Sequence, residues 1–197
     1  MPRSPVVRCV VAAGLLLVVG ILLMAPGCSS PRPNRIPVGE VFPTVAGRSL
    51  EGDPVELPAA YAGAPVVLVV GYLQKTQFDI DRWILGLLQS GVDVRIVEVP
   101  TIPGLVPGLA SGWIDEGMRS GIPPEDWGSV VTLYGRAADP VAAFTGTEGG
   151  RNGRVLLLDG EGRVAWFADE GYAPREMMEL AAAIETLREP GAAGDGG

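Results

Sequence analysis

The sequence predicts a three-layer α/β domain, in which helices cover the faces of a mixed central sheet that begins with a β-hairpin. An apolar, β-branched run at 66–73 leads through a polar turn into a helical pattern starting at Phe78, as expected for a buried strand followed by a helix. A second strand is predicted at 93–99, and a strand-helix-strand unit implies a parallel pair with a right-handed crossover. Residues 154–159 and 163–167 are predicted to form an antiparallel hairpin, which makes the sheet mixed.

The elements around the central strand follow from local signals. Residues 38–43 and 47–57 are expected to supply two short strands around the turn Glu51-Gly52-Asp53-Pro54. The first helix is expected to span 78–90, with Gly91 as its C-terminal stop. The apolar stripe predicted for this helix consists of Ile80, Trp83, Ile84, Leu87 and Leu88.

The second half of the chain completes the domain. Pro100 is expected to end the second strand, and 101–107 to form a loop broken by Pro and Gly. A helix at 109–119, a turn at 121–126, a strand at 129–134 and a short helical turn at 140–144 are predicted in that order. Pro174 opens the last helix. Its predicted apolar stripe consists of Met177, Leu180, Ala181, Ile184 and Leu187.

The first 27 residues are predicted to be a signal peptide, with Arg3 and Arg8 before an apolar run. Its end, Ala25-Pro-Gly-Cys28, resembles the lipobox of bacterial lipoproteins, a family in which the cysteine becomes the first residue and carries the lipid, including palmitate. The resemblance implies a cell-envelope protein held outside the cytoplasm by lipidated Cys28. Ser29 after the cysteine resembles the outer-membrane sorting signal of Gram-negative bacteria, so the domain would face the periplasm. The alternative is an uncleaved membrane anchor.

Four segments are therefore expected: the signal peptide at 1–27, an extended tether at 28–37, the folded domain at 38–188 and a flexible tail at 189–197.

Composition excludes several functions. The formal net charge is −8, and after the leader 13 basic residues face 23 acidic ones, giving −10, so a nucleic-acid partner is not expected. The chain has no histidine, which removes Ser-His-Asp and Cys-His catalysis and histidine-ligated metals. The only cysteines are Cys9 and Cys28, so no disulfide is expected within the domain. No cofactor and no metal site are predicted.

The order of elements resembles the thioredoxin fold, and several segments are similar to the peroxiredoxin and redoxin branch of that superfamily. The segment Gly47-x-x-Leu-x-Gly-x-x-Val-x-Leu57, followed by Gly63-Ala-Pro-Val-Val-Leu-Val-Val70, is similar to the opening hairpin and first core strand of those proteins. Arg154-Val-Leu-Leu-Leu-Asp-Gly-Glu-Gly-Arg-Val164 is similar to their late hairpin. The resemblance covers about residues 38–187.

Peroxiredoxins carry a Thr-x-x-Cys motif where the first core helix begins. In this sequence Thr76 falls on the threonine and Asp79 on the cysteine. Peroxide reduction and disulfide exchange require a thiolate, so thiol peroxidase activity is not expected to carry over. The supporting arginine of the family falls near Gly153, one residue from Arg154, and a shift by one residue in a strand turns the side chain to the other face.

Polar side chains crowd the junction between the central strand and the first helix, and ligands of open α/β sheets favour the carboxyl ends of strands. The candidate binding patch consists of Tyr72, Gln74, Thr76, Gln77, Asp79, Arg82, Asn152 and Arg154. The alternative for Thr76 and Asp79 is a capping box, which stabilises the helix start and requires no ligand.

Two functions follow from these observations. The leading hypothesis is a membrane-anchored, cysteine-less lipoprotein that binds, scaffolds or assembles an envelope protein partner and does not catalyse. The competing hypothesis is a redoxin-family oxidoreductase or another enzyme, with cofactor-free acid-base chemistry using Asp79 together with Arg82 or Arg154.

Overall fold

The structure is a computed structural model that describes residues 31–104 and 108–188. The predicted signal peptide, Cys28 and the predicted tail lie outside the described residues. None of the helices in the described ranges combines the length and the apolar character needed to cross a bilayer.

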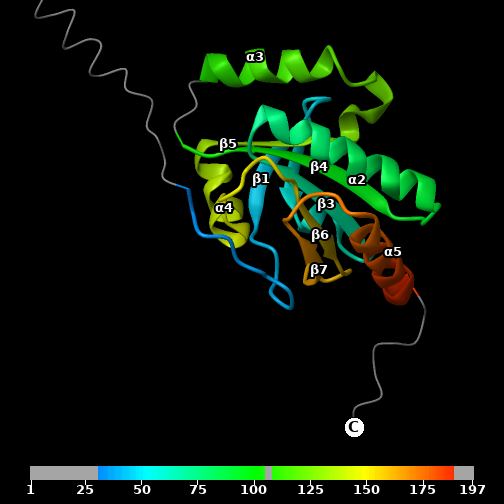
Figure 1. Ribbon diagram of the computed structural model, residues 1–197. Helices are drawn as coiled ribbons and strands as arrows, with labels where there is room; N and C mark the ends of the chain where they lie inside the picture. Colours follow the sequence, from blue (N-terminus) through cyan, green and yellow to red (C-terminus); the bar gives the residue numbers. More distant parts are fainter. Residues whose placement is uncertain (1–30, 105–107, 189–197) are drawn as a thin grey trace, which may run out of the picture.

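A seven-stranded sheet forms the centre of the domain, with the spatial order β2-β1-β5-β4-β3-β6-β7 (Figure 1). The strands are β1 (Val45–Ser49), β2 (Pro54–Leu57), β3 (Val66–Gly71), β4 (Arg95–Ile102), β5 (Val131–Tyr134), β6 (Arg154–Leu158) and β7 (Val164–Ala168). Strands β3, β4 and β5 run parallel, whereas β1 is antiparallel to β5 and β6 is antiparallel to β3. The predicted mixed sheet with an N-terminal hairpin is confirmed.

Helices lie on both faces of this sheet (Figure 1). The α-helices are α2 (Gln77–Ser90), α3 (Gly108–Arg119), α4 (Asp139–Thr145) and α5 (Pro174–Arg188). Short 3-10 turns are η1 (Ala59–Tyr61), η2 (Gln74–Thr76), η3 (Pro124–Ser129) and η4 (Gly135–Ala137). Helices α2 and α5 pack together over one face, and α4 packs on the other.

The central strand β3 contributes alternate side chains to two cores. Val67 and Val69 join the core under α2 and α5, which includes Trp83. Leu68 and Val70 join the core on the α4 side. All six residues of β3 are buried, so the continuous apolar run correctly predicted a strand covered on both faces.

Helix α2 confirms most of its predicted stripe. Ile80, Trp83 and Leu87 are buried, and Gly91 ends the helix in the left-handed conformation with φ 70°. Leu88 was predicted to belong to the stripe, but it is 68% exposed. Leu88 lies about 100° around the helix from Leu87, beyond the half-buried Ile84, and so falls outside the buried face.

Two strand predictions are corrected. Strand β4 does not end at Pro100 but continues to Ile102. Pro100 is the last residue of β4 to pair with β3, and the pairing with β5 is interrupted between Glu98 and Thr101, so the missing proline N–H falls at this interruption. The strand expected at 38–43 is reduced to an isolated bridge between Val41 and Arg163, because the chain turns at Gly39, whose φ is 85°.

Candidate functional site

The junction after β3 is closed by Thr76. This residue is fully buried, and its Oγ1 accepts a hydrogen bond from the Leu73 N–H at 3.2 Å and donates one to the Gly150 carbonyl at 2.7 Å. It makes no side-chain cap bond to α2. The predicted capping box is therefore wrong, because the hydroxyl is used by the preceding turn and by the loop before β6.

Asp79 joins α2 to two distant loops. Its Oδ2 accepts a hydrogen bond from the Gly153 N–H at 2.8 Å, and its Oδ1 accepts one from the Tyr172 N–H at 2.7 Å. Gly153 precedes β6 and Tyr172 precedes α5. The carboxylate thus satisfies two backbone donors with charge-assisted hydrogen bonds, the stronger class of hydrogen bond in proteins.

Arg154 lies on the other face of the sheet. It pairs with Val70 in the register of β3 and β6, and it is fully buried on the α4 side, where its guanidinium lies 5.7 Å from the centre of the Tyr72 ring. Asp79 belongs to the helix on the opposite face. The structure therefore does not bring the side chains of Asp79 and Arg154 together. The period of a strand implies this separation, because Arg154 is one residue from Gly153, whose N–H binds Asp79.

The acceptors around Arg154 are all neutral. Its guanidinium donates to the Asn152 carbonyl at 2.9 Å, to Asn34 Oδ1 at 2.9 Å and to the Glu148 carbonyl. Its Nε finds no acceptor among the described residues. Burial lowers the pKa of Arg154 from its ordinary value, and the negative charge of Asp169 opposes that change. Arg154 therefore organises carbonyls inside the domain and is closed to solvent.

The predicted patch is consequently divided. Tyr72 and Arg154 belong to the α4 side, where the Tyr72 hydroxyl lies 2.7 Å from the Thr145 hydroxyl and burial raises the pKa of Tyr72 to about 12. Thr76 and Asp79 tie α2 to its neighbouring loops. The members exposed on the surface of η2 and α2 are Gln74, Gln77 and Arg82.

A buried carboxylate near the start of α2 was not part of the predicted patch. Glu98 on β4 is only 8% exposed. Burial raises the pKa of Glu98 to about 7, a hydrogen bond with Gln77 lowers it and the charge of Asp81 raises it. Gln77 also donates to Asp81 at 2.9 Å. The signal in the sequence was an acid at an inward position of an otherwise apolar strand.

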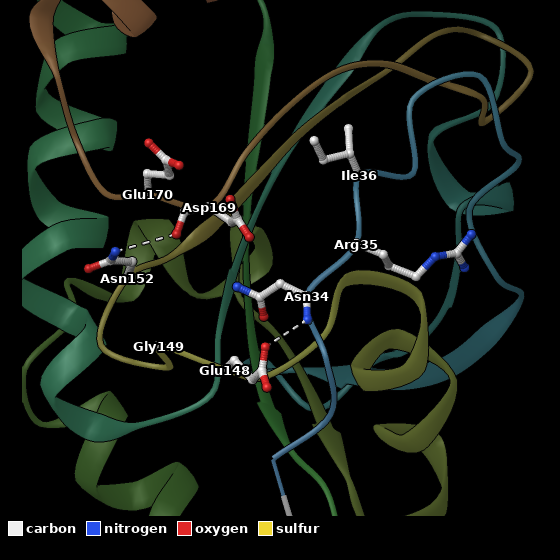
Figure 2. A pocket seen from close by; sticks show the side chains of 8 residues that line it. All are labelled: Asn34, Arg35, Ile36, Glu148, Gly149, Asn152, Asp169 and Glu170. Atoms are coloured by element: carbon white, nitrogen blue, oxygen red, sulfur yellow. Dashed lines mark hydrogen bonds between the residues drawn. The ribbon is translucent and has the colours of Figure 1, made fainter.

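A shallow pocket of about 470 Å³ lies near the loop before β6 (Figure 2). It is lined by Asn34, Arg35, Ile36, Glu148, Gly149, Asn152, Asp169 and Glu170. Figure 2 shows that its walls come from three segments far apart in the sequence, with the N-terminal segment on one side and the 169–170 loop on the other. Asn152 is the one predicted patch residue that lines it, and the side chains facing the pocket are mostly polar and acidic.

The fold is similar to those of several solved structures, although the sequence has no recognisable relative in two other comparisons. No protein-family model matches the sequence, and no curated protein matches it. A SCO1/SenC family lipoprotein from Bacillus anthracis superposes with a TM-score of 0.52 at 15% identity, over 80% of this chain and 100% of that one. Yeast Sco1 with copper bound gives 0.54 at 12% identity, over 81% and 98%.

A third similar structure is BsSco, a member of the Sco family of cytochrome c oxidase assembly proteins, with a TM-score of 0.52 at 12% identity, over 78% of this chain and 96% of that one. At such identities the likeness establishes the architecture alone. The chain has the thioredoxin-like α/β fold, as the sequence predicted.

Proposed function

We propose that this protein is a lipoprotein, anchored outside the cytoplasm through Cys28, whose thioredoxin-like domain binds or helps to assemble an envelope protein partner without thiol catalysis. The anchor is supported by the lipobox-like sequence that ends at Cys28. The assembly role is supported, at the level of fold, by similarity to Sco-family structures, one of them a lipoprotein.

The contacts of Asp79 support the non-catalytic part of the proposal. The resemblance to peroxiredoxins puts the reactive cysteine at this position. A carboxylate cannot attack a peroxide or a disulfide as a thiolate does. Both oxygens of Asp79 accept backbone hydrogen bonds, which assigns this side chain to holding the junction together.

Copper binding is not carried over from yeast Sco1. Soft thiolate ligands and imidazoles are the groups that favour copper. This chain has no histidine, and both cysteines precede the described domain. Within residues 31–104 and 108–188 no group of three or more His, Cys, Asp or Glu side chains is arranged to hold a metal ion.

The redox part of the proposal is tested with the purified full chain in detergent. Peroxide consumption and the reduction of insulin disulfides by a thiol donor are expected to stay at the rate without protein, with a thioredoxin as the positive control. Turnover above that rate would overturn the non-catalytic assignment.

The anchoring and partner parts are tested in the producing bacterium. Metabolic labelling with a palmitate analogue is expected to mark the wild-type chain and not Cys28→Ser. Crosslinking in native membranes should then recover one envelope protein with the wild type and with Arg136→Ala, an exposed change on η4, but not with Cys28→Ser. Equal recovery with Cys28→Ser would contradict a role for the anchor.

A further inference from the structure

The segment that follows the proposed lipidation site is bound to the domain. The Arg32 N–H donates to Thr147 Oγ1 at 2.8 Å, and the Thr147 N–H donates back to the Arg32 carbonyl at 2.9 Å. Gly146 lies so close to this segment that a Cβ at Gly146 would be 2.3 Å from the Cα of Asn34. The expected tether is therefore bound from Arg32 onward.

Side chains strengthen this attachment. The Arg32 guanidinium donates to the Asp139 carbonyl at 3.1 Å and lies 3.3 Å from the Asp139 carboxylate. The Arg35 guanidinium lies 5.7 Å from the centre of the Phe144 ring. Figure 1 shows the segment running along the outside of α4, which it contacts through these two arginines. Because α4 is part of the packed core, the position of residues 32–35 is fixed relative to the sheet.

Three apolar side chains are exposed directly after the bound segment. Ile36 is 74% exposed, Val38 51% and Val41 52%. The turn that carries them is held by the β6–β7 hairpin, since the Gly39 N–H donates to the Val164 carbonyl at 2.8 Å and the Val164 N–H donates to the Glu40 carbonyl at 2.9 Å. We call these three side chains the apolar turn.

Charges of both signs lie around the apolar turn: the acidic Glu148, Asp169 and Glu170 line the pocket beside Ile36, and the Arg163 guanidinium donates to the Gly39 carbonyl at 2.7 Å. Arg32 pairs with Asp139, and Arg35 pairs with Glu40. The chain after the leader carries a net charge of −10, which opposes contact with an anionic bilayer. The N-terminal segment from Arg32 to Val41 instead carries two basic residues and one acidic residue, so this segment does not itself add to the repulsion of an anionic lipid.

We propose that the apolar turn inserts into the bilayer interface beside the lipid on Cys28 and thereby fixes the orientation of the domain on the membrane. The inference rests on the proposed lipidation. Four residue steps separate Cys28 from the bound Arg32, a span of at most about 14 Å. A lipid at Cys28 therefore keeps the apolar turn close to the bilayer, and at that effective concentration a small apolar contact suffices to set the orientation.

The test uses the lipidated full chain, whose mature form would carry no thiol besides the blocked Cys28. Single cysteines replace Ile36, Val38 or Val41, and matched control cysteines replace Phe78 or Leu88, which are 79% and 68% exposed on α2 across the sheet. Each variant is labelled with a nitrobenzoxadiazole dye and reconstituted into vesicles of phosphatidylethanolamine and phosphatidylglycerol containing doxyl-labelled phosphatidylcholine.

Quenching by the doxyl lipid is expected to be about threefold stronger at the three positions of the apolar turn than at the two control positions. In the Val38→Ser/Val41→Ser background, quenching at position 36 should fall to the level of the controls. Equal quenching at all five positions, or stronger quenching on α2, would overturn the proposal. Shielding of the apolar turn that occurs in native membranes but not in protein-free vesicles would also overturn it, because the occupant would then be a protein.

The intact mass of each preparation separates this inference from the proposed function. A mass that includes the lipid, together with uniform quenching, overturns the apolar turn as a membrane contact and leaves the anchor standing. A mass without lipid overturns both. Unchanged circular dichroism of the labelled variants shows that the comparison is made on folded protein.

Discussion

Each face of the sheet holds a charged side chain without a charged hydrogen-bonding partner. The two side chains differ in burial and in the groups that form hydrogen bonds with them. On the α2 side the Asp79 carboxylate is half-buried and receives two backbone N–H groups. On the α4 side the Arg154 guanidinium is fully buried and donates to two carbonyls and an amide oxygen. Both charges are stabilised by backbone dipoles, so each connects segments of the fold.

A third charge shows the contrasting case. Glu98 lies under the start of α2 with Gln77 as its side-chain partner and the like charge of Asp81 nearby. Burial raises the pKa of the Glu98 carboxyl to about 7, and the hydrogen bond with Gln77 offsets this only in part. Asp79 and Arg154 therefore have structural roles, whereas Glu98 makes the stability of the fold depend on pH.

The largest effect is expected for Arg154→Ala. The change removes three donated hydrogen bonds and leaves a cavity, so the free energy of unfolding should fall by about 4 kcal/mol. Urea unfolding measures the loss, and trypsin should cleave faster after Arg35 because the tie to Asn34 is gone. The matched control is Arg151→Ala, an exposed change expected to stay within about 0.5 kcal/mol. Equal stability of the two variants would show that Arg154 does not connect the segments.

Asp79→Ala tests the other face. Loss of two charge-assisted hydrogen bonds should lower the free energy of unfolding by about 3 kcal/mol, and by less in Asp79→Asn, which keeps one acceptor. The control is Asp81→Ala on the same helix, where the carboxylate is exposed and accepts from Gln77 alone. If both alanine variants lost the same small amount, Asp79 would be a surface residue with no structural role.

Glu98→Gln tests whether the buried Glu98 carboxyl makes the stability of the fold depend on pH. A carboxyl whose pKa is 4.5 in the unfolded chain and about 7 in the folded one makes the protein less stable as pH rises between those values. Below pH 4.5 both states are protonated, and above pH 7 the full penalty of about 3 kcal/mol is present. Urea unfolding at pH 5, 6, 7 and 8 should show the wild type losing stability relative to Glu98→Gln, and parallel curves would refute the assignment.

Gly146→Ala is expected to have the smallest effect, and it tests whether the N-terminal segment is held against Gly146. A Cβ there would collide with the Asn34 backbone, and the φ of 76° disfavours any other residue, so a loss of about 2 kcal/mol is expected. Gly149→Ala is the matched control, because Gly149 has a φ of 61° but nothing within 4 Å of its Cβ position. Faster tryptic cleavage after Arg35 in Gly146→Ala alone would show that the segment has been displaced.

Much of the fold could be predicted because its signals are local. The run at 66–71, the stop at Gly91 and the stripe of Met177, Leu180 and Ile184 each follow from side-chain periodicity or from the conformation of one residue. The strand through Pro100 could not be predicted, because the missing N–H is tolerated only at the interruption of the β4–β5 pairing between Glu98 and Thr101, which is a tertiary feature.

The candidate site was predicted less well. The sequence placed the polar residues at one end of the sheet, but it did not separate those on the α4 side from those on the α2 side. The contacts of Asp79 join residues 74 and 93 positions apart, and the bond from Arg154 to Asn34 joins residues 120 positions apart. No local pattern encodes such pairs.

The sequence by itself determined the order of strands and helices, the acidic character of the domain and the lack of a thiol or an imidazole after Cys28, since these are properties of composition and local periodicity. The period of a strand already indicated that Arg154 turns away from Asp79, but only the tertiary structure decided which groups bind these two charges, that Glu98 is buried, and that the segment from Arg32 onward is bound to the domain. Those outcomes depend on which distant segments pack together and on how much water each charge loses when they do.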